Sequence, residues 1–303
     1  MGTARGLVTR LSTWRPRRRS AVAFVLSGGG PLGALQVGQL QALAEKGIIP
    51  DLILGVSVGG VNGVFTASDP TPAGAKRLEE VWLRMKREHL FPKGKIVSAW
   101  NAVKRGSHVF SNAGLRKLLD SELVEKTFED LQVPCQVVAT NLETGAETWF
   151  SSGPITDPLL ASSAMPGIFP PVEIDGVAYI DGGVANNIPF SRAVELGATK
   201  IYVLNVHSWF QPRPLTRPHD FMMHGYLLAR AQRYRHDLER LSPRAQIIEF
   251  PPVDVGHVPF TNLSQTERLI QAGRTAALEF LGPAPAATEP EMTEPPEIAP
   301  QQA

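Results

Sequence analysis

Short apolar runs rich in β-branched residues alternate along the chain with longer segments that have the periodicity of helices. The first run covers 22–26 and precedes a helical pattern over 33–46, and the second covers 52–55 and precedes another over 58–66. Strands that alternate with helices in this way are typical of a parallel sheet covered by helices. The sequence therefore predicts an α/β protein with a mainly parallel central sheet.

The alternation continues through the second half of the chain. Further strands are predicted over 137–140, 177–180 and 201–206, and further helices over 73–89, 112–119, 157–164, 191–196, 221–240 and 264–282. Asn112 is expected to cap its helix, and Ser264 with Glu267 is expected to form a capping box at the start of the last one. A hairpin is predicted around 143–145, and the irregular stretch before Val109 is expected to cover a site.

The two ends of the chain differ in composition from its middle. Residues 1–20 contain a cluster of arginines, and residues 283–303 are dominated by proline, alanine, glutamate and threonine. Segments with few large apolar side chains do not bury enough surface to fold. We expect a basic flexible leader over 1–20, a folded domain over 21–282 and a disordered tail over 283–303. Adhesion of the leader to anionic lipid is an alternative for the first segment.

Charge and composition narrow the possible partners. The 30 basic and 29 acidic side chains leave a formal net charge of +1, so no nucleic-acid partner is expected. No run reaches the roughly 20 consecutive apolar residues of a membrane-spanning helix. The single cysteine, Cys135, is expected to be buried in a reducing compartment. We expect a cytoplasmic protein, with peripheral contact at a membrane and the oligomeric state left open.

A glycine-rich loop follows the first predicted strand. From Ser27 to Gly33 it reads Ser-Gly-Gly-Gly-Pro-Leu-Gly, and a predicted helix begins at its end. Without Cβ atoms, the N–H groups of Gly28, Gly29 and Gly30 are able to approach a bound atom closely, beside the positive end of that helix. The loop is therefore predicted to hold an anion, either a phosphate or the oxyanion of a reacting ester.

A second motif stands where the second predicted strand meets its helix, and it reads Gly55-Val56-Ser57-Val58-Gly59. A serine on such a sharp turn projects its hydroxyl above the edge of the sheet, and glycines two positions to either side relieve the crowding of the turn. Ser57 is the candidate nucleophile, with Gly55 and Gly59 as supporting residues. The N–H of Val58 is a further candidate donor to an oxyanion.

Asp181 follows the apolar run 177–180 and precedes two glycines, Gly182 and Gly183. An Asp-Gly pair after a strand is most often a turn. In a chain with a candidate nucleophile, an aspartate at the end of a neighbouring strand is also placed to accept the serine proton directly. Asp181 is therefore the candidate base, and the two glycines would let its loop approach Ser57.

The three motifs occur in the order found in the patatin-like phospholipase family, which the chain resembles over about 22–206. The stretch Ala161–Pro171 also resembles the segment that precedes the aspartate in bacterial members. The resemblance implies a three-layer α/β/α fold and lipid acyl hydrolase activity on a lipid or lysophospholipid. It also implies a dyad of Ser57 and Asp181 without histidine, and no metal or organic cofactor. One departure is Leu32, because many members have arginine or lysine at that position.

Alternative functions remain open. His207, after the strand 201–206, or His257 would complete the triad of a Ser-Asp-His esterase. The spacing Gly28-x-Gly30-x-x-Gly33 matches the dinucleotide fingerprint of a nucleotide-binding regulator, but the second strand does not end in the acidic residue that a ribose needs. A lipid-binding protein without hydrolytic activity is the third alternative.

The predicted helix over 221–240 interleaves apolar and basic residues. It is expected either to pack on the core with a basic outer face or to contact a lipid surface. Trp209 and Phe210, just before it, would form an apolar rim in the second case. No Cys or His residues have the spacing of metal ligands, so no metal site is expected.

Overall fold

The computed structural model describes residues 21–91, 108–206 and 216–283 of the 303-residue chain. The predicted leader, nearly all of the predicted tail and most of the irregular stretch before Val109 lie outside these ranges. His207, Trp209 and Phe210 lie outside them as well, so the predictions for those residues stay predictions.

An eight-stranded sheet forms the centre of the described molecule. Its strands are β1 (Val22–Leu26), β2 (Leu52–Val56), β3 (Cys135–Asn141), β4 (Glu147–Phe150), β5 (Val172–Ile174), β6 (Val177–Asp181), β7 (Lys200–Leu204) and β8 (Gln246–Glu249). They lie in the order β5-β6-β3-β2-β1-β7-β8, with β4 paired to β3. The neighbours from β3 through β8 in this order are parallel, whereas β4, β5 and β6 pair antiparallel. The prediction of a mainly parallel sheet is confirmed.

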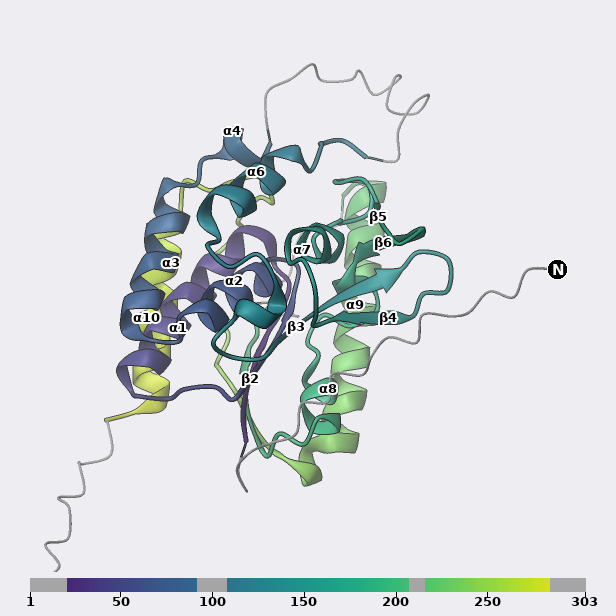
Figure 1. The fold of residues 1–303 in the computed structure, drawn as a ribbon. Helices are drawn as coiled ribbons and strands as arrows, with labels where there is room; N and C mark the ends of the chain where they lie inside the picture. The colour runs from purple at the N-terminus through teal and green to yellow at the C-terminus, as the bar shows by residue number, and fades with distance from the viewer. Residues whose placement is uncertain (1–20, 92–107, 207–215, 284–303) are drawn as a thin grey trace, which may run out of the picture.

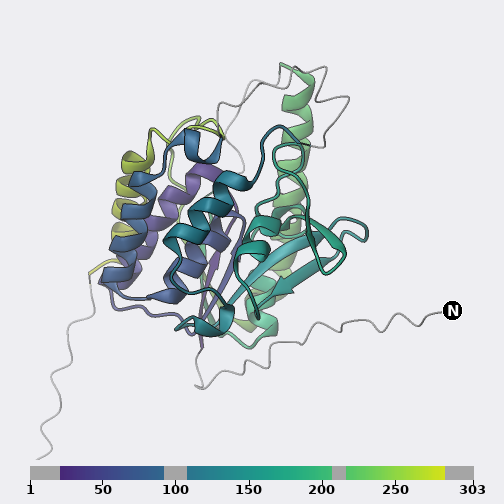
Figure 2. The same ribbon diagram turned by 45° about the horizontal axis from the view of Figure 1, so that its top comes forward.

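Helices cover both faces of this sheet (Figures 1 and 2). They are α1 (Gly33–Glu45), α2 (Val58–Ser68), α3 (Pro72–Arg84), α4 (Arg87–Leu90), α6 (Ala113–Glu122), α7 (Thr156–Ser162), α8 (Phe190–Glu195), α9 (Pro218–Leu241) and α10 (Thr266–Leu281). The layer of α1, α2, α3 and α10 packs on one face, and α8 and α9 pack on the other. The three-layer α/β/α architecture is therefore confirmed.

Strand β1 shows why the sequence pattern marks the sheet so clearly. Successive side chains of a strand point to opposite faces. Phe24 and Leu26 pack in the cluster beneath α1 and α2, whereas Ala23 and Val25 pack beneath α8 and α9. Because both faces are buried, the strand reads as a continuous apolar run instead of an alternating one.

Helices α1 and α10 pack with their backbones in direct contact. A Cβ atom at Gly38 would lie 2.1 Å from the carbonyl oxygen of Ile270, and a Cβ at Gly273 would lie 2.2 Å from that of Leu35. Any side chain at either glycine would push the two helices apart. This contact explains how α10, at the far end of the chain, is fixed against the first helix.

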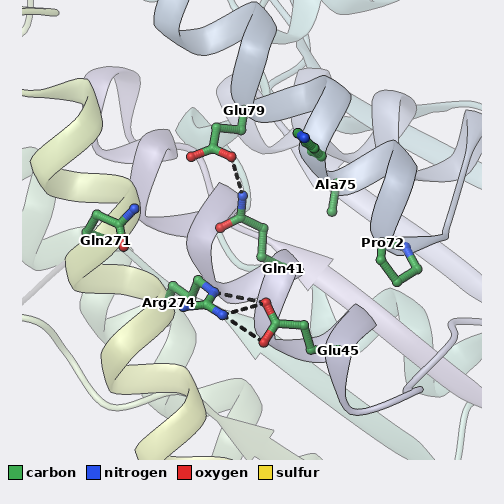
Figure 3. Close-up of a pocket in the computed structure, with 8 residues that line it drawn as sticks. Gln41, Glu45, Pro72, Ala75, Glu79, Gln271 and Arg274 are labelled. Atoms are coloured by element: carbon green, nitrogen blue, oxygen red, sulfur yellow. Dashed lines mark hydrogen bonds and ion pairs between the residues drawn. The ribbon is translucent and has the colours of Figure 1, made fainter.

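A polar surface pocket lies between α1, α3 and α10 (Figure 3). Within it, Arg274 forms a two-pronged ion pair with Glu45, and Gln41 donates a hydrogen bond to Glu79. The polar side chains of this pocket therefore have hydrogen-bond partners among themselves. The pocket lies at the carboxyl end of α1, whereas the glycine-rich loop lies at the amino end, so it is separate from the candidate site.

A buried polar network ties the glycine-rich loop to the sheet and to α3. The Nε2 of Gln36 donates to the backbone oxygens of Ser27 and Leu204 at 2.8 and 3.0 Å. The amide of Asn62 donates to Gln36 Oε1 at 3.0 Å and accepts from Trp82 Nε1 at 2.8 Å. All three side chains are buried, so each depends on its partners within the protein.

We expect Asn62→Leu to destabilise the protein, because it leaves Trp82 Nε1 and Gln36 Oε1 buried without partners. Each unsatisfied buried group costs about 1–3 kcal/mol. Urea unfolding followed by circular dichroism measures the loss. Gln271→Leu, at an exposed position of α10, is the control and is expected to change stability by no more than about 0.5 kcal/mol. An unchanged midpoint for Asn62→Leu would contradict the role of the network.

Two helix starts differ from the sequence predictions. Helix α10 begins at Thr266, and the expected capping box is absent because the hydroxyl of Ser264 donates to Asn262 Oδ1 at 2.8 Å instead. Helix α6 begins after Asn112 as predicted, but that side chain makes no capping hydrogen bond. The hydroxyl of Ser111 accepts the N–H of Ala113 at 3.2 Å in its place. Both capping predictions were wrong because a neighbouring side chain competes.

Other differences concern the lengths and number of elements. Helix α3 ends at Arg84, earlier than the predicted 89, and α4 follows as a separate short helix. The hairpin predicted around 143–145 is confirmed, because β4 follows it and pairs antiparallel with β3. The strands β5 and β8 were not predicted. Each has only three or four residues, which is too short for a periodic pattern. Cys135 is buried in β3 as expected, and burial raises the pKa of its thiol to about 12.

Helix α9 has two different halves. Its later turns pack on the core through Tyr234 and Leu241. Its first turns expose apolar side chains, with 59% of Phe221, 77% of Met222 and 39% of Met223 accessible. Among the residues described, no helix combines the length and the apolar character that a membrane crossing requires. The second half of this helix therefore packs on the core, as one expectation has it, and contact of its first turns with a lipid surface stays a prediction.

Candidate active site

Ser57 stands between β2 and α2 in a strained backbone conformation. Its φ is 53° and its ψ is −125°, a region that residues other than glycine rarely adopt. A Cβ at Gly55 would lie 2.5 Å from the carbonyl oxygen of Gly59, and a Cβ at Gly59 would lie 2.4 Å from that of Leu26. The close approach of these backbones therefore requires glycine on both sides of the serine.

The backbone of Ser57 is held by a residue that the motifs did not single out. Its N–H donates to the hydroxyl oxygen of Ser162 at 2.7 Å. Ser162 is the last residue of α7 and is completely buried. It lies in the stretch Ala161–Pro171, so the only sequence signal for it was the family resemblance of that stretch.

The glycine-rich loop lies against this turn and presents a row of amide groups. A Cβ at Gly28 would lie 3.3 Å from the Cβ of Ser57, and a Cβ at Gly33 would lie 2.5 Å from a methyl group of Val58. Within the described part of the chain, the N–H groups of Gly28, Gly29, Gly30 and Val58 make no hydrogen bond to another backbone group. They are available to an oxygen atom of a bound molecule.

Asp181 reaches the site from a strand that runs in the opposite direction. It is the last residue of β6, which is antiparallel to β3. The carboxyl end of β6 therefore points away from the edge where β1 and β2 end. Asp181 is still near Ser57 because β6 pairs only with the end of β3, from Ala139 to Asn141, and Asp181 lies opposite Ala139.

Several hydrogen bonds fix both the backbone and the carboxylate of Asp181. Its N–H donates to the carbonyl oxygen of Ala164 at 3.0 Å, and its own carbonyl oxygen accepts from the hydroxyl of Thr140 at 2.9 Å. The N–H of Gly183 donates to Asp181 Oδ1 at 2.7 Å. A Cβ at Gly182 would lie 2.2 Å from the Val138 carbonyl oxygen, so the loop after the aspartate presses directly on β3.

The carboxyl of Asp181 is only 7% exposed. Burial raises its pKa, because removal from water disfavours the ionised form. The positive charge of Arg230, the N–H of Gly183 and a hydrogen bond with the side chain of Ser57 each lower the pKa in part. The side chains of the candidate nucleophile and the candidate base thus lie close enough to interact.

Two further residues gather around Gly183, and neither was predicted from the sequence. A Cβ at Gly183 would lie 2.7 Å from Asn187 Oδ1, 2.9 Å from Arg230 Nη2 and 2.9 Å from Asp181 Oδ1. Asn187 Oδ1 would also lie 2.7 Å from a Cβ at Gly28. Its amide therefore lies between the loop of the aspartate and the glycine-rich loop, and Nδ2 donates to the carbonyl oxygen of Gly28 at 3.4 Å.

Buried polar atoms without hydrogen-bond partners concentrate in this region. The described residues contain four such side-chain atoms, and three of them are Ser163 Oγ, Asn187 Oδ1 and Arg230 Nε. Ser163 lines a pocket together with Ser57. Unpaired buried groups are rare in native proteins, and three in one place indicate a site that binds a molecule or ordered water.

We expect Gly183→Ala to lower catalytic activity strongly while changing stability little. The added methyl would collide with flexible ends of side chains, which are able to move, but their movement would displace the Asp181 carboxylate. A misplacement of about 1 Å costs on the order of 100-fold in rate. Steady-state kinetics measure the activity of the variant, and thermal unfolding measures its stability, each relative to the wild type.

Gly225→Ala on α9 is the control for this variant, since no atom lies within 4 Å of its Cβ position. It is expected to retain full activity and to gain about 0.5–1 kcal/mol of stability from helix propensity. Equal rates for Gly183→Ala and the control would contradict the crowding around Gly183.

An apolar pocket of about 80 Å³ opens beside Ser57. Its walls come from α3, α4, α6 and the loop before α10, and they include Trp82, Leu90, Leu118 and Phe260. Polar lining atoms are few, and they belong mainly to the glycine-rich loop and the serines. Such a pocket suits a hydrocarbon chain whose reactive end lies at Ser57.

Of the two histidines of the alternative triad, only His257 lies within the described residues. His257 is exposed and is not among the residues that line the pocket, and His207 lies outside the described ranges. In residues 21–91, 108–206 and 216–283, no group of three or more His, Cys, Asp or Glu side chains is arranged to hold a metal ion.

A serine on a strained strand-to-helix turn, with unbonded amides and a buried carboxylate beside it, is the arrangement typical of α/β serine hydrolases. Within that class, residues 24–194 match the family model described as patatin-like phospholipase. The match covers more than half of the chain. The chain therefore belongs to the patatin-like phospholipase family.

Curated relatives are similar over the same region. Patatin-like phospholipase domain-containing protein 7 of Mus musculus is 31% identical over 195 residues, which cover 62% of this chain and 14% of the relative. Lysophospholipase nte1 of Aspergillus terreus is 30% identical over 196 residues, which cover 62% of this chain and 12% of the relative. The chain thus spans only about one seventh of the length of these relatives.

A solved structure was also found to be similar. It is human GIVD cytosolic phospholipase A2 in complex with methyl gamma-linolenyl fluorophosphonate, at 13% identity and a TM-score of 0.46. The match covers 85% of this chain and 57% of that one.

Proposed function

We propose that the chain is a serine acyl hydrolase that cleaves carboxylic ester bonds of lipids, with Ser57 as nucleophile and Asp181 as base. The buried Asp181 carboxylate, which lies close enough to the Ser57 side chain to interact with it, is the observation that supports this proposal most directly. No histidine is needed between them. A triad through His257 is less well supported, because His257 is exposed and does not line the pocket, and a triad through His207 stays a prediction outside the described residues.

In the first half of the reaction, Asp181 accepts the hydroxyl proton while Ser57 Oγ forms a bond to the ester carbonyl carbon. The oxyanion that develops accepts hydrogen bonds from the amides of Gly28, Gly29, Gly30 and Val58. One such donor is worth roughly 2.7–4 kcal/mol of transition-state stabilisation. The carbon–oxygen bond of the ester then breaks, and the leaving alcohol takes the proton from Asp181.

In the second half, Asp181 accepts a proton from water while the water oxygen attacks the acyl-enzyme carbonyl carbon. The same amides stabilise the second oxyanion. When this intermediate collapses, Ser57 Oγ leaves and recovers the proton, and a fatty acid is released. All proton transfers involve the aspartate, so no metal or organic cofactor enters the reaction.

The apolar pocket and the names of the relatives support a lipid or lysophospholipid substrate. A dinucleotide is less well supported, because the pocket beside the glycine-rich loop is lined mainly by hydrocarbon.

We also propose peripheral contact with a bilayer through the exposed Phe221, Met222 and Met223 of α9. Vesicle sedimentation of the variant with all three replaced by serine tests this contact, which unchanged binding would rule out.

Labelling with an alkyl fluorophosphonate tests the proposed nucleophile. The reagent is expected to add to Ser57, and mass spectrometry of the digested protein should locate the adduct there. A non-hydrolytic lipid-binding protein would bind vesicles without labelling or ester turnover. Saturable binding of NAD without labelling would support the nucleotide-binding alternative instead.

We expect the activity to show an acidic limb at a higher pH than an ordinary aspartate would give. Asp181 accepts a proton only when ionised, and burial raises its pKa above the usual value of about 3.9. kcat/KM should therefore rise with pH through this raised pKa and then level off. The pH profile of kcat/KM for p-nitrophenyl butyrate measures it. A limb at or below the ordinary value would contradict Asp181 as the base.

A further inference from the structure

Arg230 is the feature of the site that the proposed mechanism does not use. It lies on the inner side of α9, and its guanidinium carbon is 4.9 Å from the centre of the Tyr226 ring. Its Nε is buried and has no hydrogen-bond partner. A buried guanidinium without close partners is costly, so its position calls for a compensating interaction.

Other arginines of the same helix have ordinary surroundings. Arg233, whose side chain is exposed, pairs with the buried Asp237 and with Glu147 at 2.9 Å each. Arg230 is different, because its Nη2 and the Oδ1 of Asp181 both border the space left by the missing side chain of Gly183, each 2.9 Å from the Cβ position. The two groups are therefore close without forming a direct ion pair.

Few other charges act on this carboxyl. In the described ranges, the ionisable groups that interact with Asp181 are Arg230 and Tyr226, both from α9, and the Ser57 hydroxyl. Tyr226 is neutral at physiological pH, since burial raises its pKa to about 12. Arg230 is thus the single positive charge that faces the buried carboxylate from these elements.

We propose that Arg230 is a positioning residue for the base, which holds Asp181 ionised and turned toward Ser57 through the gap at Gly183. The inference rests on the proposed function, in which Asp181 accepts the serine proton. It gives α9 a second role besides covering the sheet. It also explains why glycine is needed at position 183, because a Cβ there would crowd both the cation and the carboxylate.

Loss of the Arg230 charge would remove the largest of the interactions that oppose burial and would raise the pKa of Asp181 further. The acidic limb of kcat/KM would then move to higher pH. If the limb moves up by about one pH unit, the rate falls about tenfold at any pH below both pKa values and recovers above them. A merely structural role would lower the rate equally at all pH values.

The experiment compares pH profiles of kcat/KM for p-nitrophenyl butyrate, a neutral ester, in wild type, Arg230→Gln and Arg230→Lys. We expect the limb of Arg230→Gln to move upward and that of Arg230→Lys to stay closer to wild type. Arg235→Gln, an exposed position of α9, is the matched control and should match the wild type. Arg230→Met, which retains packing against Tyr226, replaces the glutamine variant if that variant does not fold.

Two outcomes would overturn the inference. One is an unchanged limb in the folded neutral variant, with or without a uniform fall in rate. The other is a normal profile on the neutral ester with a raised KM only for anionic phospholipid vesicles, which would make Arg230 a headgroup contact. Asp181→Asn provides the reference, because Arg230→Gln should have no further pH effect in that background. Failure of the proposed function is recognised separately, since wild type itself would then not turn over the ester.

Discussion

Ser57→Ala is expected to reduce hydrolysis of p-nitrophenyl butyrate by about 10⁴-fold or more, the largest effect of any single substitution in the chain. Without the hydroxyl, no acyl-enzyme forms, and only the amides and the pocket remain to assist water. Stability should not fall, because alanine removes no hydroxyl contact that the core requires. Alanine still has to adopt the strained turn, as serine does.

Initial rates and fluorophosphonate labelling measure this loss, with thermal unfolding as the check on folding. Ser121→Ala on α6 is the matched control, because it removes an exposed hydroxyl from a residue that does not line the pocket. Both variants should unfold at the wild-type temperature, and only Ser57→Ala should lose rate and labelling together. Substantial turnover by folded Ser57→Ala would remove the proposed nucleophile.

Asp181→Asn is expected to lower kcat by roughly 10⁴-fold, because an amide accepts no proton from Ser57. The substitution retains the shape of the side chain and one oxygen that can accept the N–H of Gly183. It also removes a buried charge, so stability is expected to be unchanged or slightly higher at neutral pH. The acidic limb of the pH profile should disappear with the carboxyl.

Asp175→Asn in the turn between β5 and β6 is the control for this charge change. Asp175 has a φ of 51°, and asparagine adopts that region as readily as aspartate does. Full activity in this control and a large loss in Asp181→Asn would locate the effect at position 181. A modest loss that leaves the acidic limb in place would mean that another group is the base.

The parts of the fold that were predicted well are those with local causes. Strand β1 is buried on both faces and reads as an apolar run, and the turn at Ser57 needs glycines at fixed positions beside it. The motifs at Gly28–Gly30, Ser57 and Asp181 carry this kind of signal. The structure brings all three together, as the family resemblance implied.

The residues that were missed act through the tertiary structure alone. Arg230 belongs to a helix with other arginines, and nothing in the spacing distinguishes it from Arg233, which forms surface ion pairs. Asn187 becomes part of the site only because two glycine loops lie on either side of it. No periodicity or motif in a single sequence shows which loops lie side by side. The place of these residues in the site is therefore visible only in the three-dimensional structure.

Capping of helix α10 is an intermediate case. The sequence correctly marked Ser264 as a hydrogen-bonding side chain near the helix start, but the predicted partner was wrong. Ser264 was expected to accept from the amides of α10, but Asn262 lies two residues earlier and accepts the serine hydroxyl first. Polar side chains near helix ends compete for few donors and acceptors. A sequence shows which polar side chains lie near a helix start, but it does not show which of them makes the hydrogen bond.

The alignment of β6 with β3 decides whether the side chain of Asp181 faces Ser57 at all. Three residue pairs, from Ala139 to Asn141, set that alignment together with hydrogen bonds from the Thr140 hydroxyl and the Leu142 N–H to β6. Side chains alternate between faces along a strand. A shift by one residue would turn Asp181 to the opposite face and bring Ile180 to the serine. Such a protein would retain its overall shape and secondary structure yet be inert, so correct folding of this lipase-like chain has to be judged by turnover rather than by shape.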